Sequence, residues 1–273
     1  MEVRSVLVNM DIANPDSPAL RYAVSLAETM GSTLIGVAAD QPNIAYAGID
    51  GGATAIDLYG LERSEIELQL ARAEEAFQSL VPKQVKRQWR ALIADRTTAL
   101  IQAARVADVL VTGSSTTSAF QQQQIVNLGA LVLSTGRPLI DVAATAAAAR
   151  FDKICIGWKD TREARRAVMD ALPFLKRARE VVAITVSEGD QPAERASLAD
   201  LLAWLKFHEI AAQSDLIANP DGYVDVLETN ALMRQADLLV IGGYGHSRMR
   251  EWLFGGVTRN ILGANSLNRL LSN

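Results

Sequence analysis

Four glycines late in the sequence have the spacing of an anion-binding loop. They form the pattern G-x2-G-x9-G at Gly242, Gly245 and Gly255, with Gly256 directly after. Glycine lets the main chain approach a ligand closely and adopt positive φ, so successive N–H groups can point at one anion. A helix predicted over residues 247–254 would add its unpaired N–H groups and its dipole. The chemistry indicated is the binding of a phosphate group.

Glycines near the end of a strand often mark only a tight turn, and the surrounding sequence separates the two interpretations. The apolar run 238–241 before Gly242 reads as a strand of a repeated β/α unit, and open α/β sheets bind ligands at the carboxyl ends of their strands. The loop lacks Gly-Lys-Ser/Thr and G-x-G-x-x-G. The pattern therefore favours a phosphate site that is neither a P-loop nor a dinucleotide fingerprint.

The elements that would position this loop are short apolar runs alternating with segments of helical period, which indicates an α/β fold around a parallel sheet. The first helix begins with Ser17 as its cap and Pro18 in its first turn. Strands are predicted in the first half at 6–8, 34–38, 89–93, 109–112 and 139–142. Those of the second half are predicted at 154–157, 181–186, 215–218, 238–241 and near Leu270.

The second half repeats the first. Residues 107–113 read ADVLVTG and residues 236–242 read ADLLVIG, so the fourth strand and its final glycine recur. We predict two domains, residues 1–143 and 151–273, separated by an alanine-rich linker that a short helix could span. The first half also carries a segment rich in glycine and alanine, 45–59, which we predict to be a loop.

Composition excludes several classes of function. The 273 residues carry a net charge of −4, which offers no general attraction for nucleic acid or anionic lipid. The single cysteine, Cys155, cannot form an internal disulfide, and it lies in an apolar strand that suggests core packing. No signal peptide or apolar run of about 20 residues is present. We therefore expect a cytoplasmic protein without a membrane or nucleic-acid partner.

The region 241–262 closely resembles the universal stress protein family, whose ATP-binding members carry G-x2-G-x9-G at this place. Weaker similarity covers both halves, including 7–11, 91–95 and the turn 135–138. The resemblance implies two tandem units, each a five-stranded parallel sheet of order 3-2-1-4-5 sandwiched by helices. It further implies that the units pair about a pseudo-twofold axis through their last strands.

The resemblance also implies which residues meet an adenine nucleotide. Backbone N–H groups of the glycines would face the phosphates, and Val186, at the end of a strand, would face adenine. The resulting set is Gly242, Gly243, Gly245, His246, Gly255, Gly256, Val257, Thr258, Val186, Lys159 and Asp160. The ligand would be ATP, ADP or AMP, with or without Mg²⁺.

Three departures from the family pattern bear on this set. Lys159-Asp160-Thr161 stands where the family has an Asp-Gly-Ser turn, so Lys159 could meet a phosphate or alter the base pocket, and Asp160 could take over a polar contact. The family Ser/Thr after the third glycine is replaced by Gly256, and Thr258 could supply the hydroxyl. The first half keeps Asp11 but has lost its glycine loop, which predicts a degenerate domain.

The leading hypothesis is a nucleotide-binding stress-response protein that acts by regulation. Slow ATP hydrolysis or phosphoryl transfer is the catalytic alternative, but no organised base, metal carboxylate and cationic stabiliser stand out. With two histidines, neither a zinc site nor a Ser-His-Asp triad is indicated, and His246 is as consistent with an exposed loop as with a phosphate contact. The third hypothesis is a ligand-free interaction module. A homodimer of tandem chains is the expected assembly.

Overall fold

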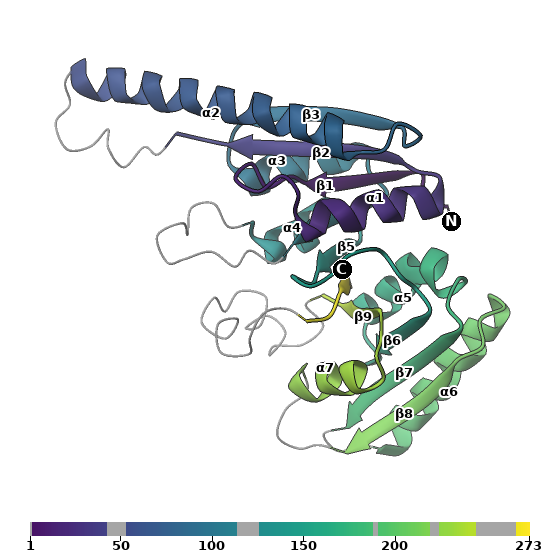
Figure 1. Ribbon diagram of the computed structural model, residues 1–273. Coiled ribbons are helices and arrows are strands. Elements are labelled where there is room, and N and C mark those ends of the chain that lie inside the picture. Colours follow the sequence, from purple (N-terminus) through teal and green to yellow (C-terminus); the bar gives the residue numbers. More distant parts are fainter. Residues whose placement is uncertain (1, 43–52, 114–125, 188–190, 219–223, 244–265) are drawn as a thin grey trace.

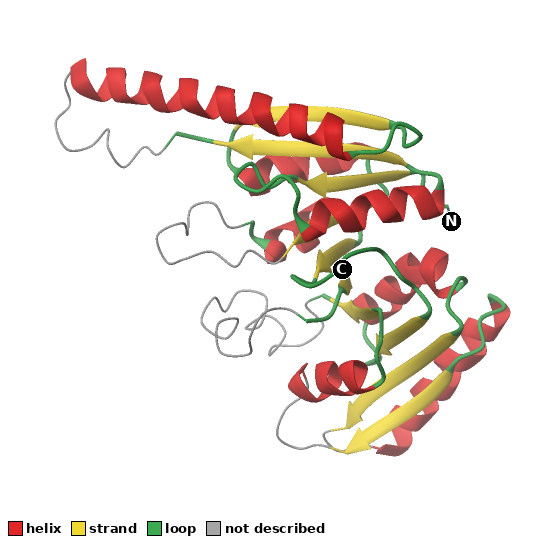
Figure 2. Ribbon diagram, viewed as in Figure 1, coloured by secondary structure: helices red, strands yellow, loops and turns green. Residues whose placement is uncertain are grey.

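Short strands alternate with helices in the computed structural model, which describes residues 2–42, 53–113, 126–187, 191–218, 224–243 and 266–273 (Figures 1 and 2). The first half contains β1 (Ser5–Asn9), α1 (Pro18–Met30), β2 (Thr33–Asp40), α2 (Ala53–Leu80), β3 (Arg87–Ile93), α3 (Arg96–Ala103), the short 3-10 helix η2 (Ala104–Val106), β4 (Val109–Gly113), α4 (Leu128–Thr135) and β5 (Leu139–Val142). The second half contains β6 (Lys153–Gly157), α5 (Arg162–Leu175), β7 (Glu180–Ser187), α6 (Gln191–Phe207), β8 (Gln213–Ala218), α7 (Val224–Met233), β9 (Leu238–Gly242) and β10 (Arg269–Ser272). Every predicted strand is confirmed.

The ten strands of the described residues form one sheet, in the order β3-β2-β1-β4-β5-β10-β9-β6-β7-β8. Neighbouring strands are parallel within each half, and each half has the predicted order 3-2-1-4-5. The halves meet through an antiparallel pair, β5 with β10. The palindromic order and the antiparallel contact are what a pseudo-twofold axis produces.

Sheet twist brings corresponding ends of the two halves to one side of the molecule. Successive strands rotate by about 20–25°, so the five steps from β1 to β6 amount to about 100–125°. The arrowheads of β1, β2, β7 and β8 consequently point to the same side of the view in Figure 1, although the halves are antiparallel where they join. The carboxyl ends of the strands therefore share one side, and the amino ends share the other.

Two apolar layers hold the helices on the sheet. Val6, Val8, Ile154 and Ile156 point toward α1, α2, α5 and α6, and the alternate residues Leu7 and Cys155 point toward α3, α4 and α7. Both faces of the strands are thus buried, which explains why they appear in the sequence as continuous apolar runs. Burial raises the pKa of the Cys155 thiol to about 11, in keeping with the predicted packing role.

The first helix forms as its sequence predicts. The backbone N–H of Leu20 donates to Ser17 Oγ over 3.2 Å, which caps the amino end, and Pro18 occupies the first turn. Gly31 ends the helix in the left-handed conformation, with φ of 68°. The second half uses the same device, because Thr161 caps α5 by accepting from the N–H of Ala164.

The junction between the halves contains a buried ionic cluster. Arg269 on β10 lies opposite Asp141 on β5, and its guanidinium contacts that carboxylate at 3.5 Å. The same guanidinium pairs with Glu228 on α7. Arg269 is 6% exposed and Asp141 is fully buried, so both charges depend on partners within the protein for their compensation.

One local prediction was wrong, and one option that the sequence left open is not realised. Residues 53–59, expected in a loop, begin α2, because the glycines of this segment all precede Ala53 and the residues after it are mostly good helix formers. Residues 143–149 form no helix. Their first N–H, that of Ala143, donates to Asn268 Oδ1, and the N–H of Ala146 donates to the Ala143 carbonyl in a turn. A seven-residue helix would be marginal in any case.

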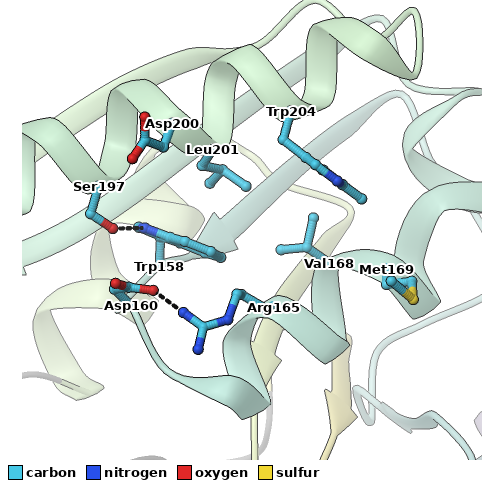
Figure 3. Close-up of a pocket in the computed structure, with 9 residues that line it drawn as sticks. All are labelled: Trp158, Asp160, Arg165, Val168, Met169, Ser197, Asp200, Leu201 and Trp204. Carbon is cyan, nitrogen blue, oxygen red and sulfur yellow. Dashed lines mark hydrogen bonds and ion pairs between the residues drawn. The ribbon is translucent and has the colours of Figure 1, made fainter.

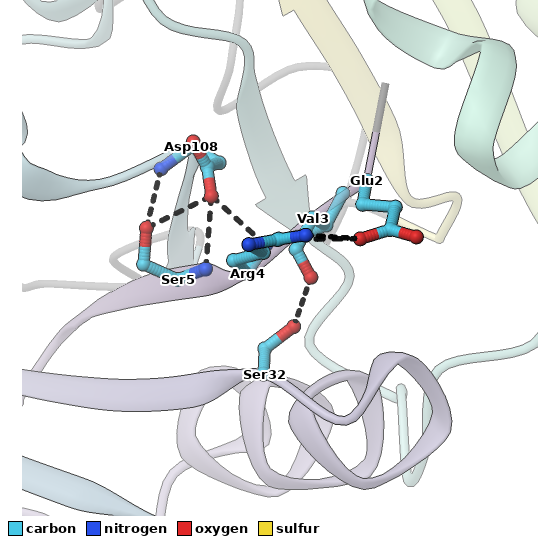
Figure 4. Close-up of polar contacts among 6 residues, drawn as sticks. All are labelled: Glu2, Val3, Arg4, Ser5, Ser32 and Asp108. Atoms are coloured by element: carbon cyan, nitrogen blue, oxygen red, sulfur yellow. Dashed lines mark hydrogen bonds and ion pairs between the residues drawn. The ribbon is translucent and has the colours of Figure 1, made fainter.

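The repeated Ala-Asp dipeptide has a structural role at the amino ends of the strands. One carboxylate oxygen of Asp108 accepts from the N–H groups of Arg4 and Ser5 and from the Ser5 hydroxyl, at 2.9–3.0 Å (Figure 4). In the second half, Asp237 accepts from the N–H of Lys153 at 2.9 Å. Each aspartate thus ties the start of the fourth strand of its half to the start of the first.

Replacing Asp108 tests this role. We expect Asp108→Ala to lower the free energy of unfolding by about 1–3 kcal/mol, because it removes the acceptor of three donors, two of which are partly buried. Glu2→Ala is the matched control, since Glu2 pairs with Arg4 in solvent and should change stability by no more than about 0.5 kcal/mol. Urea unfolding followed by circular dichroism measures both. Equal effects would contradict the assigned role of Asp108.

Candidate functional site

The carboxyl ends of β6, β7 and β9 form the edge of the sheet at which the predicted ligand residues gather. We call it the ligand edge. β6 pairs on one side with β7 and on the other with β9, so the three ends are adjacent. Lys159, Asp160, Val186, Gly242 and Gly243 all lie within three residues of a strand end here. The other predicted site residues fall outside the described part of the chain: Gly245, His246, Gly255, Gly256, Val257 and Thr258.

Gly242 is a glycine because helix α5 lies directly against it. A Cβ at this position would come within 2.5 Å of the backbone nitrogen of Ala164 and 2.6 Å of the carbonyl carbon of Glu163. These atoms belong to the first turn of α5, which cannot yield as a flexible side chain would. The sequence predicts that another group approaches the main chain closely at Gly242. In the structure that group is the backbone of α5.

Gly243 packs at the junction of the two halves. Its N–H donates to the carbonyl of Ser272 on β10 over 2.6 Å, and an added Cβ would lie 2.7 Å from Val132 Cγ1 in the first half. Its amide hydrogen is therefore used within the sheet.

The Lys159-Asp160-Thr161 segment makes a tight turn into α5. The N–H of Thr161 donates to the carbonyl of Lys159 over 2.6 Å, and Asp160 forms an ion pair with Arg165 one helical turn later. Both partners of that pair are more than half exposed, so the pair contributes little to stability. Lys159 itself is partly buried at the ligand edge, where the sequence predicts it.

Val186 lies at the end of β7 with 3% of its surface exposed. It belongs to the apolar layer that also contains Leu227 of α7. Contact of this side chain with adenine stays a prediction.

A pocket that the sequence did not reveal lies beside this turn, between α5 and α6. It measures about 460 Å³, and Figure 3 shows two tryptophans in its wall, Trp158 directly after β6 and Trp204 on α6. The indole N–H of Trp158 donates to Ser197 Oγ over 2.8 Å, which fixes the ring. The Asp160–Arg165 pair also lines the pocket. Such a mainly apolar hollow with a few polar groups suits a small organic molecule.

In the first half, the turn after β1 forms hydrogen bonds to the side chain of its own aspartate. Asp11 Oδ1 accepts from the N–H groups of Ala13 and Asn14, at 3.0 and 3.3 Å. At the end of β4, a Cβ on Gly113 would meet only the Cβ of Ala19, at an ordinary 3.4 Å. The first helix therefore stands farther from this glycine than α5 stands from Gly242.

Comparisons with solved structures decide the fold. A universal stress protein from Archaeoglobus fulgidus matches 100% of this chain and 97% of its own, with a TM-score of 0.70 and 15% identity. A putative universal stress protein from Pseudomonas aeruginosa matches 99% of this chain and 93% of its own, at 0.55 and 17%. The chain has a tandem universal-stress-protein fold. No family profile and no curated protein matches the sequence significantly.

The universal-stress-protein fold explains why the ligand edge forms where it does, since the sheet order leaves the carboxyl ends of β6 and β9 side by side. No group of three side chains that could ligate a metal occurs among the described residues. Within the same residues, each helix is too short or too polar to cross a membrane.

Matched glycine variants test the geometry at the two strand ends. We expect Gly242→Ala to destabilise the protein by about 1–3 kcal/mol, because the new methyl overlaps the backbone of α5. Gly113→Ala should cost less than about 1 kcal/mol, because Ala19 leaves room for the methyl. Thermal and urea unfolding of the two variants provide the comparison. A Gly242→Ala protein as stable as Gly113→Ala would show that α5 does not press on β9.

Proposed function

We propose that this protein binds an adenine nucleotide in its second half and acts as a regulatory binding protein. The main support is the position of the G-x2-G-x9-G pattern, which starts at the carboxyl end of β9. That end lies beside β6 and against the capped first turn of α5. The phosphates would be held by N–H groups of Gly245, Gly255 and Gly256, with any Mg²⁺ carried by the nucleotide.

The difference between the halves supports one site per chain. The second half has the glycine pattern and an open pocket beside the turn after β6. In the first half the carboxylate of Asp11 accepts hydrogen bonds from the backbone of its own turn. The sequence of that half also lacks the glycine pattern. A single nucleotide per tandem chain is therefore the expected stoichiometry.

A ligand-free interaction module is the second candidate, and one observation favours it. Gly242 and Gly243 are both accounted for by packing, and the N–H of Gly243 is already bonded to Ser272. A chain could keep these two glycines without ever binding a nucleotide. Nucleotide analysis separates the candidates.

Nucleotide released from freshly purified, denatured protein provides the test. We expect about one adenine nucleotide per chain by mass spectrometry, or saturable binding of added ATP by calorimetry. Gly245→Asp should weaken that binding at least about tenfold, because a carboxylate repels phosphate within the loop. Thr116→Asp, at the matching position of the first half, is the control and should leave binding unchanged.

Failure to bind ATP at millimolar concentration would overturn the proposal in favour of the interaction module. Conversion of bound ATP to ADP by the wild type but not by Gly245→Asp would point to slow hydrolysis. Location in the cytoplasm and assembly of tandem chains into dimers stay predictions.

A further inference from the structure

A cleft with a basic lining lies where the two halves meet, at the amino ends of their strands. It measures about 660 Å³, within the range of small-molecule sites. Its charged walls come from Arg4 and Lys86 of the first half and from Lys176 and Arg177 of the second, with Glu2 as the one carboxylate. We call this feature the junction cleft.

The charge of the junction cleft contrasts with that of the molecule. The whole chain carries −4, whereas four cations and one carboxylate leave the cleft at +3. Arg4 pairs with Glu2 over 2.9 Å in solvent. Lys86 and Lys176 form no ion pair within the described ranges of the chain, and both side chains are exposed.

Nearby acids do not neutralise these lysines. Asp152 pairs with Arg179 at 3.1 Å, and Glu180 pairs with Lys153 at 3.8 Å. Neither acid lines the cleft. The positive charge of the cleft is thus not balanced by the acids at the start of the second half.

Helix ends explain only part of this charge. The carboxyl ends of α1 and α5 lie at the cleft, where cations are favourable because each helix end carries about half a negative charge. Two such ends amount to about one negative charge, which leaves about two positive charges uncompensated. An anion in the cleft would supply that compensation.

Both halves contribute to the cleft through a direct contact. The guanidinium of Arg177 lies 3.3 Å from Met30 Sδ and donates to the carbonyl of Thr29 over 3.4 Å. This contact joins the end of α5 to the end of α1. A ligand held by Lys86 and Lys176 would span the same two halves.

We propose that the junction cleft binds a small, multiply charged oxyanion of the size of pyrophosphate or triphosphate. The four cations would hold the anion from both halves and so favour their docked arrangement. The site lies at the amino ends of the strands, at the opposite end of the sheet from the carboxyl ends of β6, β7 and β9.

Inorganic tripolyphosphate is the probe that tests the proposal. Calorimetry at low salt should show saturable binding, and the double variant Lys86→Glu/Lys176→Glu should weaken it at least about tenfold because two attractions become repulsions. Binding should also raise the unfolding temperature of the wild type, since the anion would bind only the folded state. All four lysines of the variant and its control are exposed, so folding should be retained, as circular dichroism verifies.

The control is Lys83→Glu/Lys206→Glu, which changes the net charge equally at residues that do not line the cleft. Equal weakening by both double variants would overturn the proposal, because it would reveal general charge attraction without a site. No saturable binding to the wild type would overturn it as well.

Gly245→Asp distinguishes this cleft from the proposed nucleotide site. The variant should lose ATP binding and keep the tripolyphosphate binding that depends on Lys86 and Lys176. Tripolyphosphate binding that is lost in Gly245→Asp and retained in the lysine variant would place the anion at the glycine loop and overturn the junction cleft. Loss of ATP binding alone would leave the cleft supported.

Discussion

The antiparallel pairing of β5 with β10 is the contact on which the arrangement of this molecule depends. It turns two five-stranded parallel sheets into one sheet and sets the position of each half against the other. Arg269, buried between Asp141 and Glu228, lies within this pair. Ion pairs of this kind add little net stability, but a slip of one residue would move the guanidinium to the other face and leave charges uncompensated. The cluster therefore specifies register, and through it the geometry of the ligand edge and of the junction cleft.

The strands could be predicted because strands buried on both faces leave a continuous apolar pattern, and the repeat doubled the signal. Their order in the sheet was implied by the resemblance to the universal stress protein family. Boundaries that depend on one hydrogen bond could not be predicted in this way. The turn at Ala143 follows from an acceptor 125 residues away, on Asn268.

The site was predicted in part: Lys159 and Asp160 do lie at the ligand edge, and Gly242 does permit a close approach. Two features could not be predicted: the contact of α5 with Gly242, and the pocket between Trp158 and Trp204. Both depend on how α5 and α6 pack on the sheet, which no local sequence pattern encodes.

The two halves show how a duplicated fold divides its tasks. Both use an aspartate to join the first and fourth strands, and both cap the first helix with a hydroxyl. They differ at the carboxyl ends, where the second half brings its helix onto the strand glycine and opens a pocket beside two tryptophans. Features that maintain the sheet are thus shared, whereas features that could meet a ligand are not.

The place of β10 in chain order has a consequence for biosynthesis. β10 follows every other described strand, yet it sits in the centre of the sheet between β5 and β9. Until it emerges from the ribosome, the nascent chain exposes two unsatisfied strand edges with apolar side chains, a condition that invites association with other chains. The first half can acquire its own layers early, but the ten-stranded sheet closes only when β10 arrives. A pause in translation before β10 would prolong this exposed state, and a chaperone that shields sheet edges would protect it.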